Sequence, residues 1–159
     1  MPSAIEMFDF GKELGIKTLC VRALYEFTRT PEIGNLFKQR SQENRLLLYK
    51  ARLLVLRTWT LECVNSVPGC VAGTTRWFPS PVCRGNQEGN QDWLIDVMES
   101  PLFQRGTKDP IVAATTLSEI DWQAKDVGYC DACLDGRREH WENVKNVIWD
   151  KLKVLVGIL

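Results

Sequence analysis

Two cysteines, Cys130 and Cys133, lie three positions apart at the start of an amphipathic stretch near the end of the chain. Thiols at this spacing can bind one metal ion together or form one reactive pair. Zinc is held by four ligands in a tetrahedron, and structural zinc sites favour cysteine thiolates. The pair therefore predicts half of a structural Zn²⁺ site at the start of the last helix.

The other half of such a site must come from elsewhere in the chain. Cys70 and Cys83 lie in an irregular middle region with 12 residues between them. Metal ligation would explain a loop of this length in a small domain. The predicted ligands are Cys70, Cys83, Cys130 and Cys133, with Cys63 as a substitute ligand.

Two other interpretations of the cysteines stay open. All six thiols could be small apolar core residues, as we predict for Cys20 in its apolar helical stretch. Alternatively, Cys130 and Cys133 could form the redox pair of a thiol enzyme or sensor, although a thioredoxin-like site requires a βαβ context that this chain does not show. His140 follows Cys133 by seven positions, about 10 Å along a helix axis. We therefore predict a packing or surface role for His140 and no metal ligation.

The overall charge of the chain argues against nucleic acids and charged membranes as general binding partners. Basic and acidic residues number 20 each in the 159 residues, so the formal net charge is zero. Nucleic-acid-binding domains normally carry a basic excess, and membrane anchoring through charge requires a polybasic cluster. A net charge of zero favours association with another protein or self-association.

Targeting signals and catalytic motifs are not apparent in the sequence. No apolar run approaches the roughly 18–20 residues that span a bilayer, and the first residues do not resemble a signal peptide. We therefore expect an intracellular protein, cytoplasmic or nuclear, whose thiols are reduced. No P-loop, dinucleotide fingerprint or nucleophile elbow appears, so we predict a non-catalytic protein. A nucleic-acid-binding module, using Arg84 and the Trp77-Phe78 pair, is the weaker alternative.

Helical signals dominate the first part of the chain. Ser3 and Glu6 form a capping-box pattern for a helix over residues 3–14, which Gly15 ends. A second helix is predicted over 17–28. Ser41 caps a long helix over 41–63, in which one apolar stripe has 3-4-3-4 spacing. The stripe comprises Leu46, Tyr49, Leu53, Leu56 and Thr60, and it is widened by Leu47, Leu48, Leu54 and Val55. Because its middle is apolar nearly all round, we expect this helix to be the central, most buried element.

The second part of the chain is predicted to be helical after an irregular stretch. Proline and glycine punctuate residues 64–90, which argues against long regular elements there. Helices are predicted over 91–99, over 109–119 with Asp109 as cap and Pro110 in the first turn, and over 133–156. The predicted fold is one all-α domain: a hairpin and long central helix over 1–63, a Cys/Pro/Gly loop over 64–90, and C-terminal helices over 91–159.

Both ends of the sequence resemble the region that follows the BTB (POZ) domain in fungal BTB-domain proteins. At the N-terminal end the similar residues are 8–25. At the C-terminal end they are the Cys130-x-x-Cys133 motif, Trp141, the run Ile148-Trp149-Asp150-Lys151-Leu152, and the apolar tail over 156–159. The resemblance covers nearly the whole chain in order, with specific motifs only at its two ends.

The resemblance also implies two cysteines between the central helix and the Cys-x-x-Cys pair, the second followed by a basic residue. Cys83 with Arg84 matches the second, and Cys70 the first. It further implies a protein–protein interaction or adaptor role. The BTB domain is missing in front of Met1, so we expect a truncated product, a fragment or a stand-alone descendant, and the dimerisation and docking activities of BTB domains are not carried over.

Overall fold

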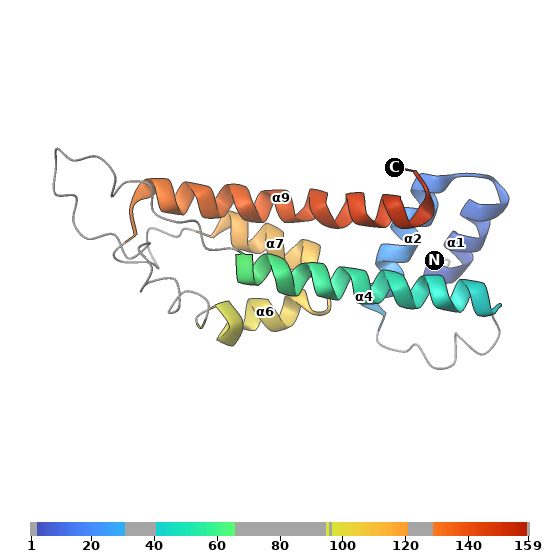
Figure 1. The fold of residues 1–159 in the computed structure, drawn as a ribbon, viewed down its shortest axis with the longest axis horizontal. Helices are drawn as coiled ribbons and strands as arrows, with labels where there is room; N and C mark the ends of the chain where they lie inside the picture. The colour runs from blue at the N-terminus through green and yellow to red at the C-terminus, as the bar shows by residue number, and fades with distance from the viewer. Residues whose placement is uncertain (1–2, 31–40, 66–94, 96, 121–128, 159) are drawn as a thin grey trace. The chain divides into compact units, whose positions relative to one another are not determined.

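The computed structural model describes residues 3–30, 41–65, 95, 97–120 and 129–158 (Figure 1). Every regular element in these residues is an α-helix, which confirms the predicted all-α class. Of the predicted loop over 64–90, residues 66–90 lie outside the described residues, whereas Val64 and Asn65 are helical and end the long helix two residues later than predicted. Most of the predicted helix over 91–99 also lies outside them, although 95 and 97–99 are helical. The helices are α1 (Ala4–Glu13), α2 (Lys17–Arg29), α4 (Gln42–Asn65), α6 (Pro101–Gly106), α7 (Pro110–Glu119) and α9 (Asp131–Val156).

The chain divides into two compact units. One consists of Met1–Thr58 and Asn146–Leu159, and the other of Trp59–Lys145. The long helices α4 and α9 each contribute residues to both units. None of the described helices is long and apolar enough to cross a membrane.

The predicted capping box starts the first unit. The Glu6 amide donates to Ser3 Oγ at 3.2 Å, and the Ser3 amide donates to Glu6 Oε2 at 2.7 Å, which satisfies two amides at the start of α1. Gly15 has a positive φ of 68° directly after this helix, a conformation that glycine adopts without strain. The prediction of a helical hairpin that turns at Gly15 is therefore confirmed.

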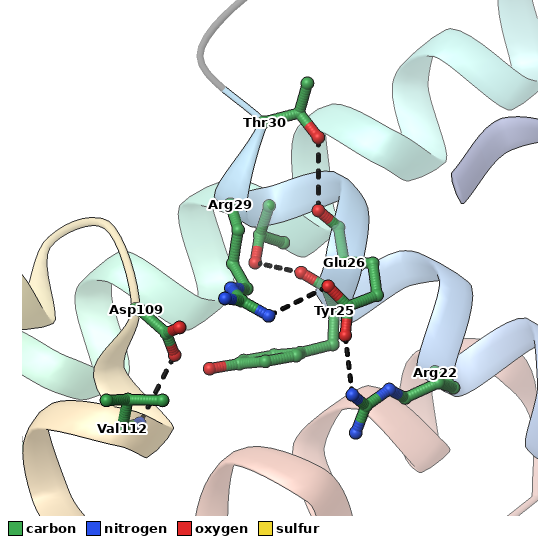
Figure 2. Close-up of polar contacts among 8 residues, drawn as sticks. Arg22, Tyr25, Glu26, Arg29, Thr30, Asp109 and Val112 are labelled. Atoms are coloured by element: carbon green, nitrogen blue, oxygen red, sulfur yellow. Dashed lines mark hydrogen bonds and ion pairs between the residues drawn. The ribbon is translucent and has the colours of Figure 1, made fainter. Parts of the chain in front are cut away.

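Helix α2 provides much of the core of the first unit. Leu24 and Phe27 are almost completely buried, and the Tyr25 ring lies 5.0 Å from the Trp149 ring of α9. On its outer side, Glu26 forms ion pairs with Arg22 at 2.7 Å and with Arg29 at 2.9 Å (Figure 2). These pairs are three or four residues apart on one helix, so they add only a few tenths of a kcal/mol each. Burial of the apolar face is the main stabilising contribution.

The predicted burial of α4 is wrong for the line with 3-4-3-4 spacing, whereas Leu48 and Val55, which widen that line, are buried as expected. The apolar members of the line are 41–63% exposed: Leu46, Tyr49, Leu53 and Leu56. Thr60 is exposed as well. The buried face is another one, formed in the first unit by Leu48, Ala51 and Val55. Because apolar residues at helical spacing occur on more than one face of α4, periodicity could not select between the faces. Ala51 allows closer packing than a leucine would.

Helices α4, α6, α7 and α9 supply the core of the second unit. Trp59 is fully buried, its Nε1 donates to the Phe103 carbonyl at 3.2 Å, and its ring lies 5.6 Å from the Trp141 ring. Helix α6 is not among the helices that the sequence predicts. Ser100 Oγ accepts from the Phe103 amide at 3.2 Å, and Pro101 occupies the first turn of the new helix.

The last two helices follow the sequence signals closely. The Val112 amide donates to Asp109 Oδ1 at 3.2 Å, as expected for the predicted cap of α7 (Figure 2). Helix α9 begins at Asp131, two residues earlier than predicted, and Gly157 ends it with a φ of 74°. One face of α9 is buried at Trp141, Val144, Ile148 and Leu152, whereas Leu155 is half-buried.

Candidate metal centre

The Cys-x-x-Cys pair lies at the N-terminal end of α9. Cys130 immediately precedes the helix and is half-buried, and Cys133 in the first turn is 3% exposed. The Cys130 carbonyl accepts from the amides of Cys133 at 2.9 Å and Leu134 at 3.1 Å, so the helical hydrogen bonds fix the backbone between the two thiols. The positive end of the helix dipole favours negative charge at this place, as a thiolate–zinc centre would carry.

Cys63 lies near the C-terminal end of α4 and is completely buried. Its burial, with a smaller contribution from the charge of Glu62, raises the pKa of this thiol to about 12. A metal ligand must be a thiolate, so without metal Cys63 is a neutral, apolar core residue at physiological pH. Cys20 is also buried, and the desolvation raises its pKa as well. The prediction that Cys20 is a core residue is confirmed.

The predicted ligand set is only partly within the described residues. Cys70 and Cys83 lie outside them. Among the described residues, no three His, Cys, Asp or Glu side chains form a group that could hold a metal ion. The zinc site therefore stays a prediction. The residues that the structure describes fit one half of it: two thiols three residues apart at a helix start, one of them buried.

Arg137 is a feature of this region that the sequence analysis missed. It lies one helical turn after Cys133, and it is 1% exposed. Its guanidinium carbon is 3.8 Å from the centre of the Tyr129 ring, a cation–π distance. Residues four apart on a helix share one face, so a permanent positive charge is buried on the face that carries Cys133. Spacing alone could not reveal this, since arginine on a helix is usually exposed.

His140 joins α9 to the end of α4 in the second unit. Its Nε2 lies 3.0 Å from the Glu62 carbonyl and 3.8 Å from Glu62 Oε2. Its ring packs edge-on against Trp141 with centroids 5.1 Å apart. This partly buried position agrees with the packing role that the sequence predicts for His140.

The buried thiol of Cys63 leads to a test of accessibility. The thiolate reacts with iodoacetamide, and a thiol with a pKa of about 12 is ionised to roughly one part in ten thousand at pH 8. We expect Cys63 in the folded chain to be alkylated only through unfolding, with a rate that still increases above pH 9. Mass spectrometry of peptides after timed labelling measures this, with denatured protein as the control.

Alkylation of Cys63 as fast as in the denatured chain would contradict its assignment as a buried, neutral thiol.

The raised pKa of Cys63 also affects the pH dependence of the free energy of unfolding. Because the folded value of about 12 exceeds the ordinary 9.0, the neutral thiol's contribution is complete below pH 9 and is lost as the pH rises toward 12.

Comparisons with known proteins identify no relative. No family model matches the chain, and no curated protein or solved structure matches it. The resemblance to the region after the BTB domain therefore stays a prediction.

Proposed function

We propose that this chain is a non-catalytic protein–protein interaction or adaptor module, stabilised by a structural zinc site with four cysteine ligands. One observation supports this function above the others: the exposed apolar line on α4, which we call the α4 seam and define as Leu46, Tyr49, Leu53 and Leu56. These side chains are 41–63% exposed. Contiguous exposed apolar surface in a folded protein typically marks a site of contact with another molecule.

The zinc part of the proposal rests on the thiols. Cys130 and Cys133 would hold the start of α9, and Cys70 and Cys83 would complete the ligand set, with Cys63 as substitute. When bound, the ion would supply structural cross-linking only. The burial of Cys133 supports a structural role over a redox one, because thiol–disulfide exchange requires an accessible sulfur. Four thiolates and Zn²⁺ have a net charge of about minus two, which the buried cation of Arg137 would partly offset.

The interaction role is tested by site-specific crosslinking in living cells. A photoreactive benzophenone amino acid replaces Leu53 in the full chain, and the matched control replaces Thr18, an exposed residue of the first unit outside the seam. We expect a discrete crosslinked species from position 53 and none from position 18. Equal yields at both positions, or no crosslink at position 53, would contradict the proposed function.

A further inference from the structure

The α4 seam has the spacing of a coiled-coil contact line. Leu46, Tyr49, Leu53 and Leu56 follow each other at intervals of three, four and three residues, which are the a and d positions of two heptads. The line is about 15 Å long at 1.5 Å per residue. The described residues Tyr49, Arg52, Leu53 and Leu56 also line a shallow hollow of about 270 Å³, which can receive a side chain from a facing helix.

The flanks of the seam are basic. The positions beside it carry Arg45, Lys50, Arg52 and Arg57, and no acidic residue occurs between Glu43 and Glu62. In a coiled coil these e and g positions face the partner helix and decide which partner is accepted. Within the described part of the chain, none of these four side chains forms an ion pair. Arg22 and Arg29, by contrast, are paired with Glu26. The four charges beside the seam are therefore available to form ion pairs with acidic residues of a partner.

A second copy of the chain does not fit this surface. Pairing two α4 seams places basic flanks opposite basic flanks whether the helices run parallel or antiparallel, and juxtaposed like charges disfavour association. The segments of this chain outside the description do not supply an acidic amphipathic helix either: residues 31–40 contain one acidic residue, residues 66–94 contain two, residue 96 is a single aspartate, and the eight residues 121–128 contain two. The zero net charge of the whole chain thus conceals a local basic face.

A membrane surface also fits less well. Helices that lie in a bilayer interface bury a broad apolar face, whereas the exposed seam is the narrow two-in-seven line that knobs-into-holes packing uses. Another apolar face of α4 is turned into the protein, with Leu48, Ala51 and Val55 each at most 3% exposed.

The geometry points to an acidic amphipathic helix of another protein as the ligand of the α4 seam. Its leucine-type side chains would pack between Leu46, Tyr49, Leu53 and Leu56, and its Glu or Asp residues would pair with the basic flanks, Arg52 and Lys50 first. This inference rests on the proposed function, because it names the chemistry of the partner at the same surface.

The test uses the full chain and three synthetic peptides of equal length with leucine at every a and d position. The e and g positions carry glutamate, lysine or glutamine. Fluorescence polarisation at low and high salt measures their binding. We expect the glutamate peptide to bind most tightly, the lysine peptide to bind at least about tenfold more weakly, and the preference to shrink at high salt.

Charge reversal provides the decisive variant. Lys50→Glu combined with Arg52→Glu should reverse the preference, so that the lysine peptide now binds more tightly than the glutamate peptide. Lys108→Glu and Arg105→Glu together change the net charge equally at exposed positions of the second unit and should leave the preference unchanged. Because all of these positions lie on the surface or at its edge, circular dichroism melts should be nearly the same for all chains.

Three results would overturn the inference: equal binding of the glutamate and lysine peptides, self-association in analytical ultracentrifugation that Leu53→Asp abolishes, or binding to phosphatidylserine vesicles that Leu53→Asp abolishes. The first of these, together with a specific crosslink from position 53, would retain the interaction function and reject only the acidic helix. Absence of both the crosslink and peptide binding would reject the two together.

Discussion

Removal of zinc should unfold most of the second unit. A structural zinc site contributes on the order of 10 kcal/mol to folding at neutral pH, and a domain of this size has a net stability of only about 5–15 kcal/mol. We expect a chelator of high affinity to lower the thermal midpoint sharply, and Cys133→Ser to have the same effect without chelator. Mass-spectrometric metal analysis should give one zinc per chain before chelation and none afterwards.

Two controls separate a metal effect from a packing effect. Cys20→Ala also removes a buried thiol, so it should lower the midpoint modestly while the zinc content stays at one. Cys63→Ala distinguishes the two possible ligand sets: unchanged zinc content supports Cys70, and lost zinc supports Cys63. A thermal midpoint that is the same with and without chelator would contradict the metal site, and rapid reaction of Cys130 and Cys133 with a thiol reagent would then favour the redox interpretation.

Local signals in the sequence predicted the helices well, because each one has a physical cause within a few residues. Ser3 with Glu6 and Asp109 with Pro110 start helices at the expected places, and Gly15 and Gly157 end them with positive φ. Each of these devices acts through a hydrogen bond or a backbone angle of its own turn. They can therefore be recognised without knowledge of the tertiary structure.

The burial of α4 could not be predicted in the same way. The stripe from Leu46 to Leu56 and the face with Leu48, Ala51 and Val55 both have helical spacing. Selection between them depends on which face meets the other helices of the first unit, and that information is tertiary. The incorrect prediction bears on the proposed function, because the face with the stronger heptad pattern is the exposed one. Its basic flanks favour an acidic helix as the partner.

The candidate metal site shows the same limit. The spacing of Cys130 and Cys133 correctly places both thiols at the start of α9. Spacing says nothing about Arg137, whose charge is buried on the face that carries Cys133, since arginine is far more often exposed than buried. Which distant cysteines would complete the predicted site likewise depends on tertiary structure and not on local spacing.

Gly106→Ala should be among the most destabilising single substitutions in the second unit. A Cβ atom at this last residue of α6 would lie 2.0 Å from Cε2 of Trp59 and 2.6 Å from its Nε1. Trp59 cannot retreat easily, because it is completely buried and its Nε1 donates to the Phe103 carbonyl. Overpacking of this kind costs about 3 kcal/mol, which corresponds to about 6–12 °C in the thermal midpoint of a chain this long.

A double-mutant cycle identifies the cause of this loss. Trp59→Phe removes the part of the indole ring that the new methyl group would strike, so Gly106→Ala should cost distinctly less in the Trp59→Phe background than alone. Chemical denaturation of the four chains measures the coupling. Additive costs would show that backbone effects at Gly106, and not contact with Trp59, determine the loss of stability. A thermal midpoint unchanged by Gly106→Ala would refute the close approach of α6 to Trp59, because a side chain at position 106 cannot be accommodated there without movement of the ring.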